Sequence, residues 1–307
     1  MVSKILNNMN KVIVGKEQVS KLILTTLLAG GHILIEDVPG VGKTAFANVL
    51  AKSVDCKFTR IQFTPDTMPS DITCSSIYNY EQHRFEYIEG AIMSNIVLAD
   101  EINRTSPKTQ ASLLEAMEEG RVSVDGKTYD LPKPFMVIAT QNPMMQRGTY
   151  YLPESQLDRF MMKITVGYPE KKDEVQIVKN MISGITAASV EAVGGMEDII
   201  CLQEDVSKIK ISDRLIEYAA ECVRRTREHD SIQLGASPRA LLAWIRAARA
   251  YAYIEGRDYV TPDDLKFLAP YILAHRLIIT QHTTKEKINE EELVKELIRK
   301  VSVPFGK

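Results

Sequence analysis

The sequence predicts an α/β fold, in which a parallel β-sheet flanked by helices is followed by a C-terminal all-helical domain. Over the first half of the chain, short β-type runs alternate with helical patterns, an order typical of strands joined by crossover helices. Three of the runs, HILIE, NIVLAD and FMVIAT, are almost continuously apolar, as expected of strands covered on both faces. From about residue 169 onward only helical patterns occur. We therefore expect two domains, at 1–168 and 169–307.

Within this order we expect five strands in the first half and four helices in the second. The strands are 32–36, 57–63, 95–100, 135–140 and 161–166. The helices are 212–227, 237–253, 261–275 and 290–300. Two of these helices have clear starts, because Ser237 and Thr261 are capping residues, each followed by a proline suited to the first helical position. The segment 184–195 has little pattern and is expected to be a loop.

Two segments interrupt the alternation and predict hairpins inserted into the first domain. The segment 121–131 (RVSVDGKTYDL) has Asp125-Gly126 between alternating residues, which is a strong signal for a two-residue turn. The segment 77–88 (IYNYEQHRFEYI) has aromatic residues on both sides of a polar tip, a weaker signal of the same kind. Both tips carry charges of both signs rather than clusters of lysine and arginine.

Composition is that of an ordinary globular protein. The chain has 307 residues, of which 45% are hydrophobic and 25% charged. Its 38 basic and 40 acidic residues give a net charge of −2, so there is no overall electrostatic case for binding nucleic acid or a membrane surface. Four scattered cysteines without a CxxC pair favour reduced thiols over disulfides or a metal site. With no signal-peptide pattern and no apolar stretch long enough to span a bilayer, a cytoplasmic protein is expected.

The segment 33–47 (ILIEDVPGVGKTAFA) combines an apolar strand, a glycine loop and the start of a helix. Its loop 40–44 (GVGKT) matches the phosphate-binding P-loop, except that Asp37 replaces the first glycine of the pattern. Glycines let backbone N–H groups and the helix N-terminus point at phosphate oxygens. In this pattern Lys43 contacts the β and γ phosphates, and Thr44 coordinates Mg²⁺.

A dinucleotide site is the rival interpretation of this loop. Gly40, Gly42 and Ala45 also satisfy the GxGxxG/A fingerprint. Lys43-Thr44 is unusual in a dinucleotide loop and expected in a triphosphate loop. A second motif decides between the two.

That second motif is an apolar strand that ends in two carboxylates, at 96–101 (IVLADE). In P-loop enzymes the first acid holds Mg²⁺, usually through water, and the second polarises the attacking water. A buried strand that ends in a solvated acidic turn is the structural alternative. Next to a P-loop the functional interpretation is favoured, with Asp100 as the metal ligand and Glu101 as the catalytic carboxylate.

Three further polar residues stand at the ends of strands or helices. Asn142 follows the strand 135–140, where it can contact a γ-phosphate or orient water, or simply form the turn before a proline. Arg159 precedes the last strand, where it can act on the γ-phosphate of a neighbouring subunit or pair with Asp158. Arg239 lies in the first turn of a helix, where cations are disfavoured unless an anion binds, although a tolerated surface arginine is the alternative.

In this order the motifs resemble those of AAA+ ATPases, and the local sequences resemble the MoxR family. The matching strings are EDVPGVGKT (36–44), RIQFTPDTMPSDI (60–72), LADEINR (98–104), ATQNP (139–143), LPESQLDRF (152–160) and GASPRA (235–240). The resemblance implies an αβα sandwich followed by a helical lid, with ATP and Mg²⁺ between them. The hairpin at 77–88 is similar to the helix-2 insert, and the segment 121–131 to the hairpin before sensor 1.

The resemblance also implies an assembly and a role. Such proteins form rings, commonly hexamers, in which Arg159 completes the neighbour's site and hydrolysis moves the lid against the core. MoxR proteins act as chaperone-like ATPases that mature protein complexes, often with partners that contain a von Willebrand factor A domain. A DNA-acting AAA+ motor and a slow nucleotide-gated binding module are the alternatives. Whether Arg239 acts on its own subunit's nucleotide or a neighbour's stays open.

Motifs and resemblance together define the expected site. The catalytic residues are Glu101, Asn142 and Arg159, the Mg²⁺ ligands are Thr44 and Asp100, and the nucleotide-binding residues are Val14, Gly15, Pro39, Gly40, Val41, Gly42, Lys43, Thr44, Ala45 and Arg239.

Overall fold

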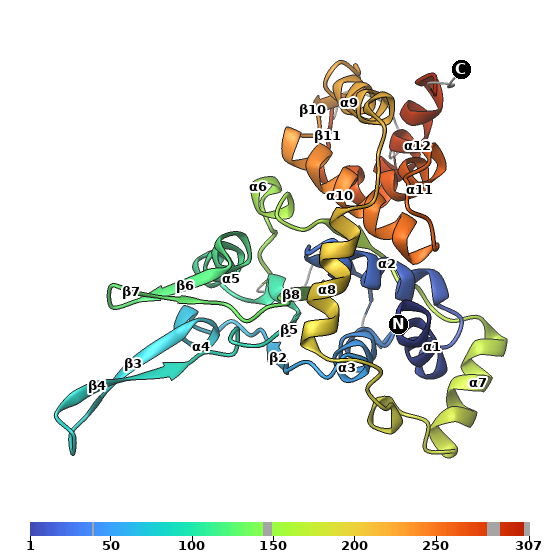
Figure 1. Ribbon diagram of the computed structural model, residues 1–307. Coiled ribbons are helices and arrows are strands. Elements are labelled where there is room, and N and C mark those ends of the chain that lie inside the picture. The colour runs from blue at the N-terminus through green and yellow to red at the C-terminus, as the bar shows by residue number, and fades with distance from the viewer. Residues whose placement is uncertain (39, 144–148, 281–288, 304–307) are drawn as a thin grey trace.

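The computed structural model describes residues 1–38, 40–143, 149–280 and 289–303. Its centre is a five-stranded sheet in the order β2-β5-β8-β1-β9, with all neighbouring strands parallel (Figure 1). The strands are β1 (Ile33–Glu36), β2 (Phe58–Gln62), β5 (Ile96–Asp100), β8 (Met136–Gln141) and β9 (Met162–Ile164). The prediction of a parallel sheet built from these five segments is therefore confirmed.

Helices pack on both faces of the sheet, and the C-terminal helices form a lid (Figure 1). Before and among the strands lie α1 (Val2–Val12), α2 (Glu17–Leu28), α3 (Lys43–Ser53), α4 (Pro69–Ile72), α5 (Pro107–Glu119) and α6 (Glu154–Leu157). After the sheet come α7 (Lys171–Ile182), α8 (Met196–Ser207), α9 (Asp213–Arg227), α10 (Pro238–Ile254), α11 (Pro262–Leu273) and α12 (Glu290–Lys300). Among the described residues, no helix is both long enough and apolar enough to cross a membrane.

The four helices expected in the second half are α9 to α12. Ser237 and Thr261 cap two of them as predicted, each accepting a hydrogen bond from the backbone N–H three residues ahead. The lid also holds a two-stranded antiparallel sheet, β10 (Ile232–Leu234) and β11 (Ile278–Ile279). Strands of three and two residues are too short to show a sequence period, which is why they were not expected.

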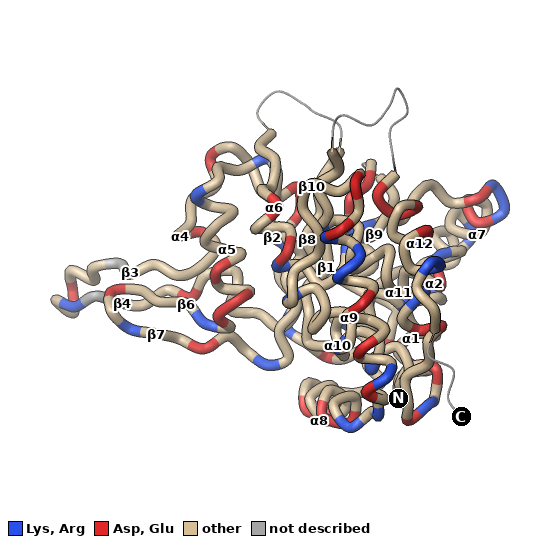
Figure 2. The backbone as a smooth tube through the Cα atoms, turned by 90° about the horizontal axis from the view of Figure 1, so that it is seen from above, with Lys and Arg blue, Asp and Glu red and all other residues tan. Residues whose placement is uncertain are grey.

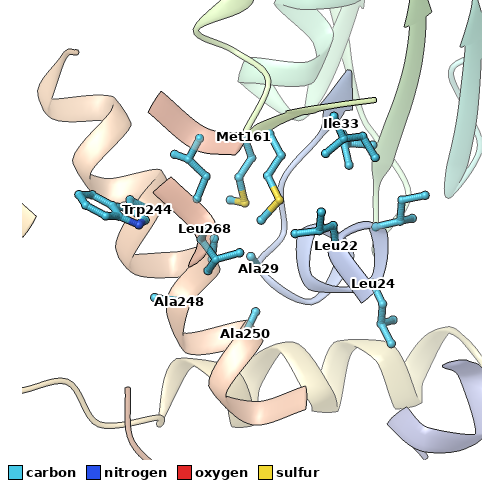
Figure 3. Packing of buried hydrophobic residues seen from close by; sticks show 14 of the residues in the cluster. Leu22, Leu24, Ala29, Ile33, Met161, Trp244, Ala248, Ala250 and Leu268 are labelled. Carbon is cyan, nitrogen blue, oxygen red and sulfur yellow. The ribbon is translucent and has the colours of Figure 1, made fainter. Parts of the chain in front are cut away.

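The two faces of the sheet bury two apolar clusters, which explains the unbroken apolar runs. Within β1, Ile33 and Ile35 face one cluster, while Leu34 faces the other. The first cluster continues through α2 into the lid, where Trp244 is fully buried and its indole N–H donates to the Leu265 carbonyl at 2.9 Å. Figure 3 shows side chains of α10 and α11 packed close to α2 and to Met161 before β9. The lid is thereby attached to the α2, β1 and β9 side of the sheet.

Two hairpins project side by side away from the sheet (Figures 1 and 2). They are formed by β3 (Cys74–Asn79) with β4 (Arg84–Glu89), and by β6 (Arg121–Val124) with β7 (Lys127–Asp130). In the second turn Asp125 and Gly126 both have positive φ, at 48° and 75°, as the type I′ turn requires. The rings of Tyr87 and Tyr129 stack with centroids 4.1 Å apart, so the two hairpins contact each other.

His32, just before β1, forms hydrogen bonds with the backbone of β8 and of α5. Its Nδ1 accepts the Val137 N–H at 3.0 Å, and its Nε2 lies 3.1 Å from the Met117 carbonyl, to which it must donate. The ring is therefore neutral with its proton on Nε2. Burial lowers the pKa of His32 to about 4, and the charges of Arg246 and Arg239 act in the same direction.

This pKa predicts a loss of stability in mild acid. The unfolded chain takes up a proton at His32 near its ordinary pKa of 6.5 whereas the folded chain does not, so stability is complete above that value and falls as pH decreases toward 4. Between pH 7.5 and pH 5.0, His32 should contribute a loss of about 2 kcal/mol in the free energy of unfolding. Urea titrations of His32→Asn, which keeps an acceptor for Val137, should show a shallower pH dependence by that amount. If the free energy of unfolding depended on pH equally in the wild type and in His32→Asn, the low pKa of His32 would be contradicted.

Candidate active site

The glycine loop between β1 and α3 presents backbone donors to a cavity. Gly40 and Gly42 have φ of 89° and 84°, a region that disfavours residues with a side chain. Gly42 is also the N-cap of α3 and supplies no side-chain cap, so the N–H groups of the first helical turn are available to an anion. Pro39 lies outside the described residues.

One cavity of about 360 Å³ collects most of the predicted phosphate and metal residues. It is lined by Gly40, Gly42, Lys43, Thr44, Arg60, Asp100, Glu101, Thr140 and Asn142. Parallel strands bring their carboxyl ends to the same edge of a sheet, and β1, β5 and β8 are neighbours there. This topology is why Lys43, Asp100 and Asn142 meet, although 57 positions separate the first two and 42 the last two.

A second, apolar cavity of about 130 Å³ adjoins the first through Gly42. It is lined by Val12, Ile13, Val14, Lys16, Val41, Gly42, Ala45, Phe46, Gly167, Pro169 and Ile177. Its mainly aliphatic walls fit the flat face of a nucleotide base. The predicted residues Val14, Val41 and Ala45 lie here. Gly15 is not among the lining residues, and a Cβ on it would lie 2.1 Å from Asp173 Oδ2, so it permits the close approach of α7.

Asp100 is held in place by two neighbouring strands. Its Oδ1 accepts the Thr140 hydroxyl at 2.6 Å, and its Oδ2 accepts Arg60 Nη2 at 2.6 Å. The carboxylate is only 14% exposed, so these bonds determine which way it points. Carboxylate and hydroxyl oxygens are ligands that Mg²⁺ accepts, directly or through water, and Asp100 and Thr44 line the same cavity. The residues present therefore fit the ion.

Glu101 has an unusual backbone conformation. Its φ and ψ are 58° and 47°, a left-handed region that costs a residue with a side chain roughly 1–3 kcal/mol. The Thr140 hydroxyl accepts the Glu101 N–H at 2.9 Å, which helps to stabilise this turn. The carboxylate Oε2 accepts Gln62 Nε2 at 3.1 Å and Arg104 Nη1 at 2.9 Å. Strain of this kind clusters at functional positions, and here it places a carboxylate in the cavity.

Lys43 and Asp37 stabilise the glycine loop. Lys43 Nζ donates to the Asp37 carbonyl, and burial lowers the pKa of Lys43 against the opposing pull of nearby carboxylates. The Asp37 side chain accepts the N–H groups of Val166 and Gly167 at 2.7 and 2.5 Å. Asp37, which departs from the P-loop pattern, thus connects the loop to the segment after β9.

Arg159 and Arg239 lie in a different place. Both pair with Glu118 on α5, Arg159 Nε at 3.2 Å from Oε2 and Arg239 Nη1 at 2.8 Å from Oε1. Together they line a third cavity of about 270 Å³. Arg159 precedes β9, and Met162 at the start of β9 pairs with Ile33 at the start of β1. The glycine loop follows the other end of β1, one strand length or about 13 Å away.

The loop that carries Arg159 is clamped by a buried arginine of the lid. Arg276 is only 3% exposed, and its Nε pairs with Asp158 Oδ1 at 2.6 Å. Its Nη2 donates to the Phe160 carbonyl at 2.7 Å. Asp158 therefore pairs with Arg276 and not with Arg159, as one alternative had it. Arg159 pairs with Glu118.

Sequence reasoning missed several residues of these sites. They are Arg60, Gln62, Glu118, Thr140 and Arg276. Arg60 and Gln62 are two positions apart in β2 and therefore point to the same face of the strand. Only the pairing of β2 with β5 places them beside Asp100 and Glu101. Glu118 and Arg276 find partners far along the chain, and no local pattern marks such pairs.

The chain is similar to known proteins over nearly its whole length. Residues 32–162 match the ATPase family associated with various cellular activities (AAA), and residues 224–297 match the AAA lid domain. The chain is 40% identical over 303 residues to Chaperone MoxR1 of Mycobacterium tuberculosis, covering 96% of this chain and 80% of that protein. It is 50% identical over 304 residues to the uncharacterized protein YeaC of Bacillus subtilis, covering 99% of this chain and 95% of that protein.

A solved structure agrees over the full length. The crystal structure of an ATPase candidate from Cytophaga hutchinsonii has a TM-score of 0.92 and 39% identity, covering 99% of this chain and 95% of that one. Its similarity includes both the sheet with its glycine loop and the lid. From these relations and from the motifs gathered at the edge of the sheet, the chain belongs to the MoxR family of AAA+ ATPases.

Proposed function

We propose that the protein is a Mg²⁺-dependent ATPase that hydrolyses ATP to ADP and phosphate within a ring of identical subunits. One observation carries the proposal: a single cavity brings together the glycine loop, Lys43, Asp100, Glu101 and Asn142. Donors for phosphate, oxygens for a divalent cation and a carboxylate for water are the groups that phosphoryl transfer requires.

Each residue then has a defined task. The N–H groups of the loop 40–44 and the Lys43 ammonium bind the phosphates, and the adjoining apolar cavity takes the base. Thr44 and Asp100 hold Mg²⁺, which when bound neutralises charge on the phosphate oxygens. Glu101 accepts a hydrogen bond from the attacking water and polarises it. Asn142 orients that water or contacts the terminal phosphate.

We propose further that Arg159 and Arg239 act on the nucleotide of an adjacent subunit. Both project near the amino ends of the strands, whereas the phosphate cavity lies at the carboxyl ends. A second copy is therefore needed to bring these two guanidinium groups to the phosphates. In a closed ring each subunit receives one pair of arginines and supplies another, so a hexamer, the common number in the family, contains six shared sites.

The ATPase cycle is proposed to remodel protein clients in the cytoplasm. The relative named Chaperone MoxR1 supports this role. The two projecting hairpins offer surfaces for a client or for a partner with a von Willebrand factor A domain. We propose the division between the nucleotide-binding core and the lid at 168/169, a few residues after β9. The hairpins carry charges of both signs (Figure 2), which does not favour the DNA-acting alternative.

ATP binding and turnover test this proposal directly. The wild-type protein is expected to release phosphate from ATP with Mg²⁺ and to stop when EDTA removes the metal. Lys43→Ala should lose nucleotide binding, measured by calorimetry, because it removes the cation that offsets the phosphate charge. Unchanged ATP affinity in Lys43→Ala would contradict the site. Turnover stimulated by added DNA would favour a DNA-acting motor, and absence of turnover in the assembled wild type would favour the binding module.

A further inference from the structure

Glu118 forms the link between the two arginines. Each of its carboxylate oxygens pairs with a different guanidinium, Oε2 with Arg159 and Oε1 with Arg239. The three residues come from three separate elements: the end of α5, the loop before β9 and the first turn of α10. Within the described parts of the chain, Glu118 is the only carboxylate that pairs with either arginine.

The atoms used in these pairs leave a particular face of Arg159 available. Glu118 contacts Arg159 through Nε, the inner nitrogen of the guanidinium. The two terminal nitrogens form the outer fork, which matches the oxygens of a phosphate in a bidentate pair. A carboxylate that lies nearest to Nε attracts the guanidinium from its inner side, which favours a fork that points away from Glu118.

The surroundings explain why a fixed carboxylate is needed. The cavity shared by Arg159 and Arg239 is also lined by Arg246 and Arg276, so like charges repel within it. Arg239 lies in the first turn of α10, where the helix dipole adds to the repulsion. Without Glu118 the half-buried Arg159 and the exposed Arg239 side chains would separate and sample several rotamers.

We propose that Glu118 is a positioning residue that holds Arg159 and Arg239 at a fixed spacing, so that both reach one anion, the terminal phosphate of a nucleotide bound by the adjacent subunit. This inference rests on the proposed action of the two arginines between subunits. Arg276 fixes the backbone of the same loop through the Asp158 and Phe160 contacts. Glu118 fixes the side chains, which the backbone clamp does not control.

Glu118→Gln tests the proposal, with Glu119→Gln as its matched control. Glu119 is the next residue of α5 and pairs with Arg121 instead. We expect Glu118→Gln to lower kcat about tenfold, with the KM for ATP and nucleotide-dependent assembly unchanged, because the ion pair with Arg159 is lost and the charged hydrogen bond from Arg239 is weakened. Glu118→Asp keeps the charge on a shorter side chain and should give an intermediate kcat. Glu119→Gln should keep the wild-type kcat.

A double-variant cycle separates this role from a general structural one. If Glu118 acts only through the two arginines, Glu118→Gln should lower kcat no further in a protein that already carries Arg159→Ala and Arg239→Ala. Losses that multiply, or equal kcat in Glu118→Gln and Glu119→Gln, would overturn the positioning role while leaving the proposed function intact. Wild-type turnover in Arg159→Ala would instead refute action between subunits, and the role of Glu118 with it.

Discussion

Glu101→Gln is expected to bind ATP like the wild type and to hydrolyse it roughly 10²- to 10⁴-fold more slowly, the usual contribution of general base catalysis. Glutamine has nearly the same size and can still contact Gln62 and Arg104, so the strained turn after β5 should persist. What it loses is the charge that polarises water. Single-turnover phosphate release, together with ATP affinity measured by calorimetry, checks both parts.

Two outcomes are informative for this variant. Glu119→Gln, which changes a carboxylate outside the phosphate cavity, should hydrolyse ATP at the wild-type rate. If Glu101→Gln did so as well, Glu101 would not be the base, and its left-handed backbone would need another explanation. If Glu101→Gln lost ATP binding too, the substitution would have disturbed the Asp100 and Thr140 network instead.

Arg159→Ala is expected to lower turnover about 10³-fold or more, as for other arginines that contact a transferring phosphoryl group. ATP should still bind, because Lys43 and the glycine loop of the same subunit are unchanged. The defect should be repaired by mixing with Lys43→Ala protein. In such a ring, a Lys43→Ala subunit supplies an intact Arg159 to the intact glycine loop of an Arg159→Ala neighbour.

The mixture distinguishes the two possible directions of action. Activity above the sum of the two separate proteins, reaching a maximum at an intermediate ratio, is the expected result. An Arg159 that served its own nucleotide would give no gain at any ratio, since no subunit would then hold both functional groups. As a control, the mixed assembly should have the same molecular mass as the wild-type assembly, which shows that the ring has formed.

Local sequence patterns predicted the parts of the site that are local in the chain. The glycine loop and the strand with Asp100 and Glu101 each need only a few consecutive residues, and their apolar strands meet because parallel sheets align their carboxyl ends. The same local patterns could not predict which residue Arg239 contacts. It follows Arg159 by 80 positions, and their pairing to one carboxylate of α5 appears only when the fold brings the first turn of α10 to the end of α5.

Other features were beyond sequence reasoning for a similar physical reason. The hydrogen bonds of Arg276 join the lid to residues 158–161. The hydrogen bonds of Asp37 with Val166 and Gly167 join the segments that follow β1 and β9, which are far apart in the chain. No local pattern in the sequence marks Arg60, and only the pairing of β2 with β5 places it on the Asp100 carboxylate. Partners of buried charges depend on the packed fold rather than on local preference.

The most direct test of a shared site is to measure specific activity and molecular mass together over a range of protein concentrations. Light scattering with ATP and Mg²⁺ gives the mass, with Glu101→Gln used to hold the nucleotide, while the wild type gives phosphate release per subunit. We predict that activity per subunit rises as the ring forms, because each phosphate cavity then gains Arg159 from a neighbour. A monomer that hydrolyses ATP equally well at every concentration would contradict the account.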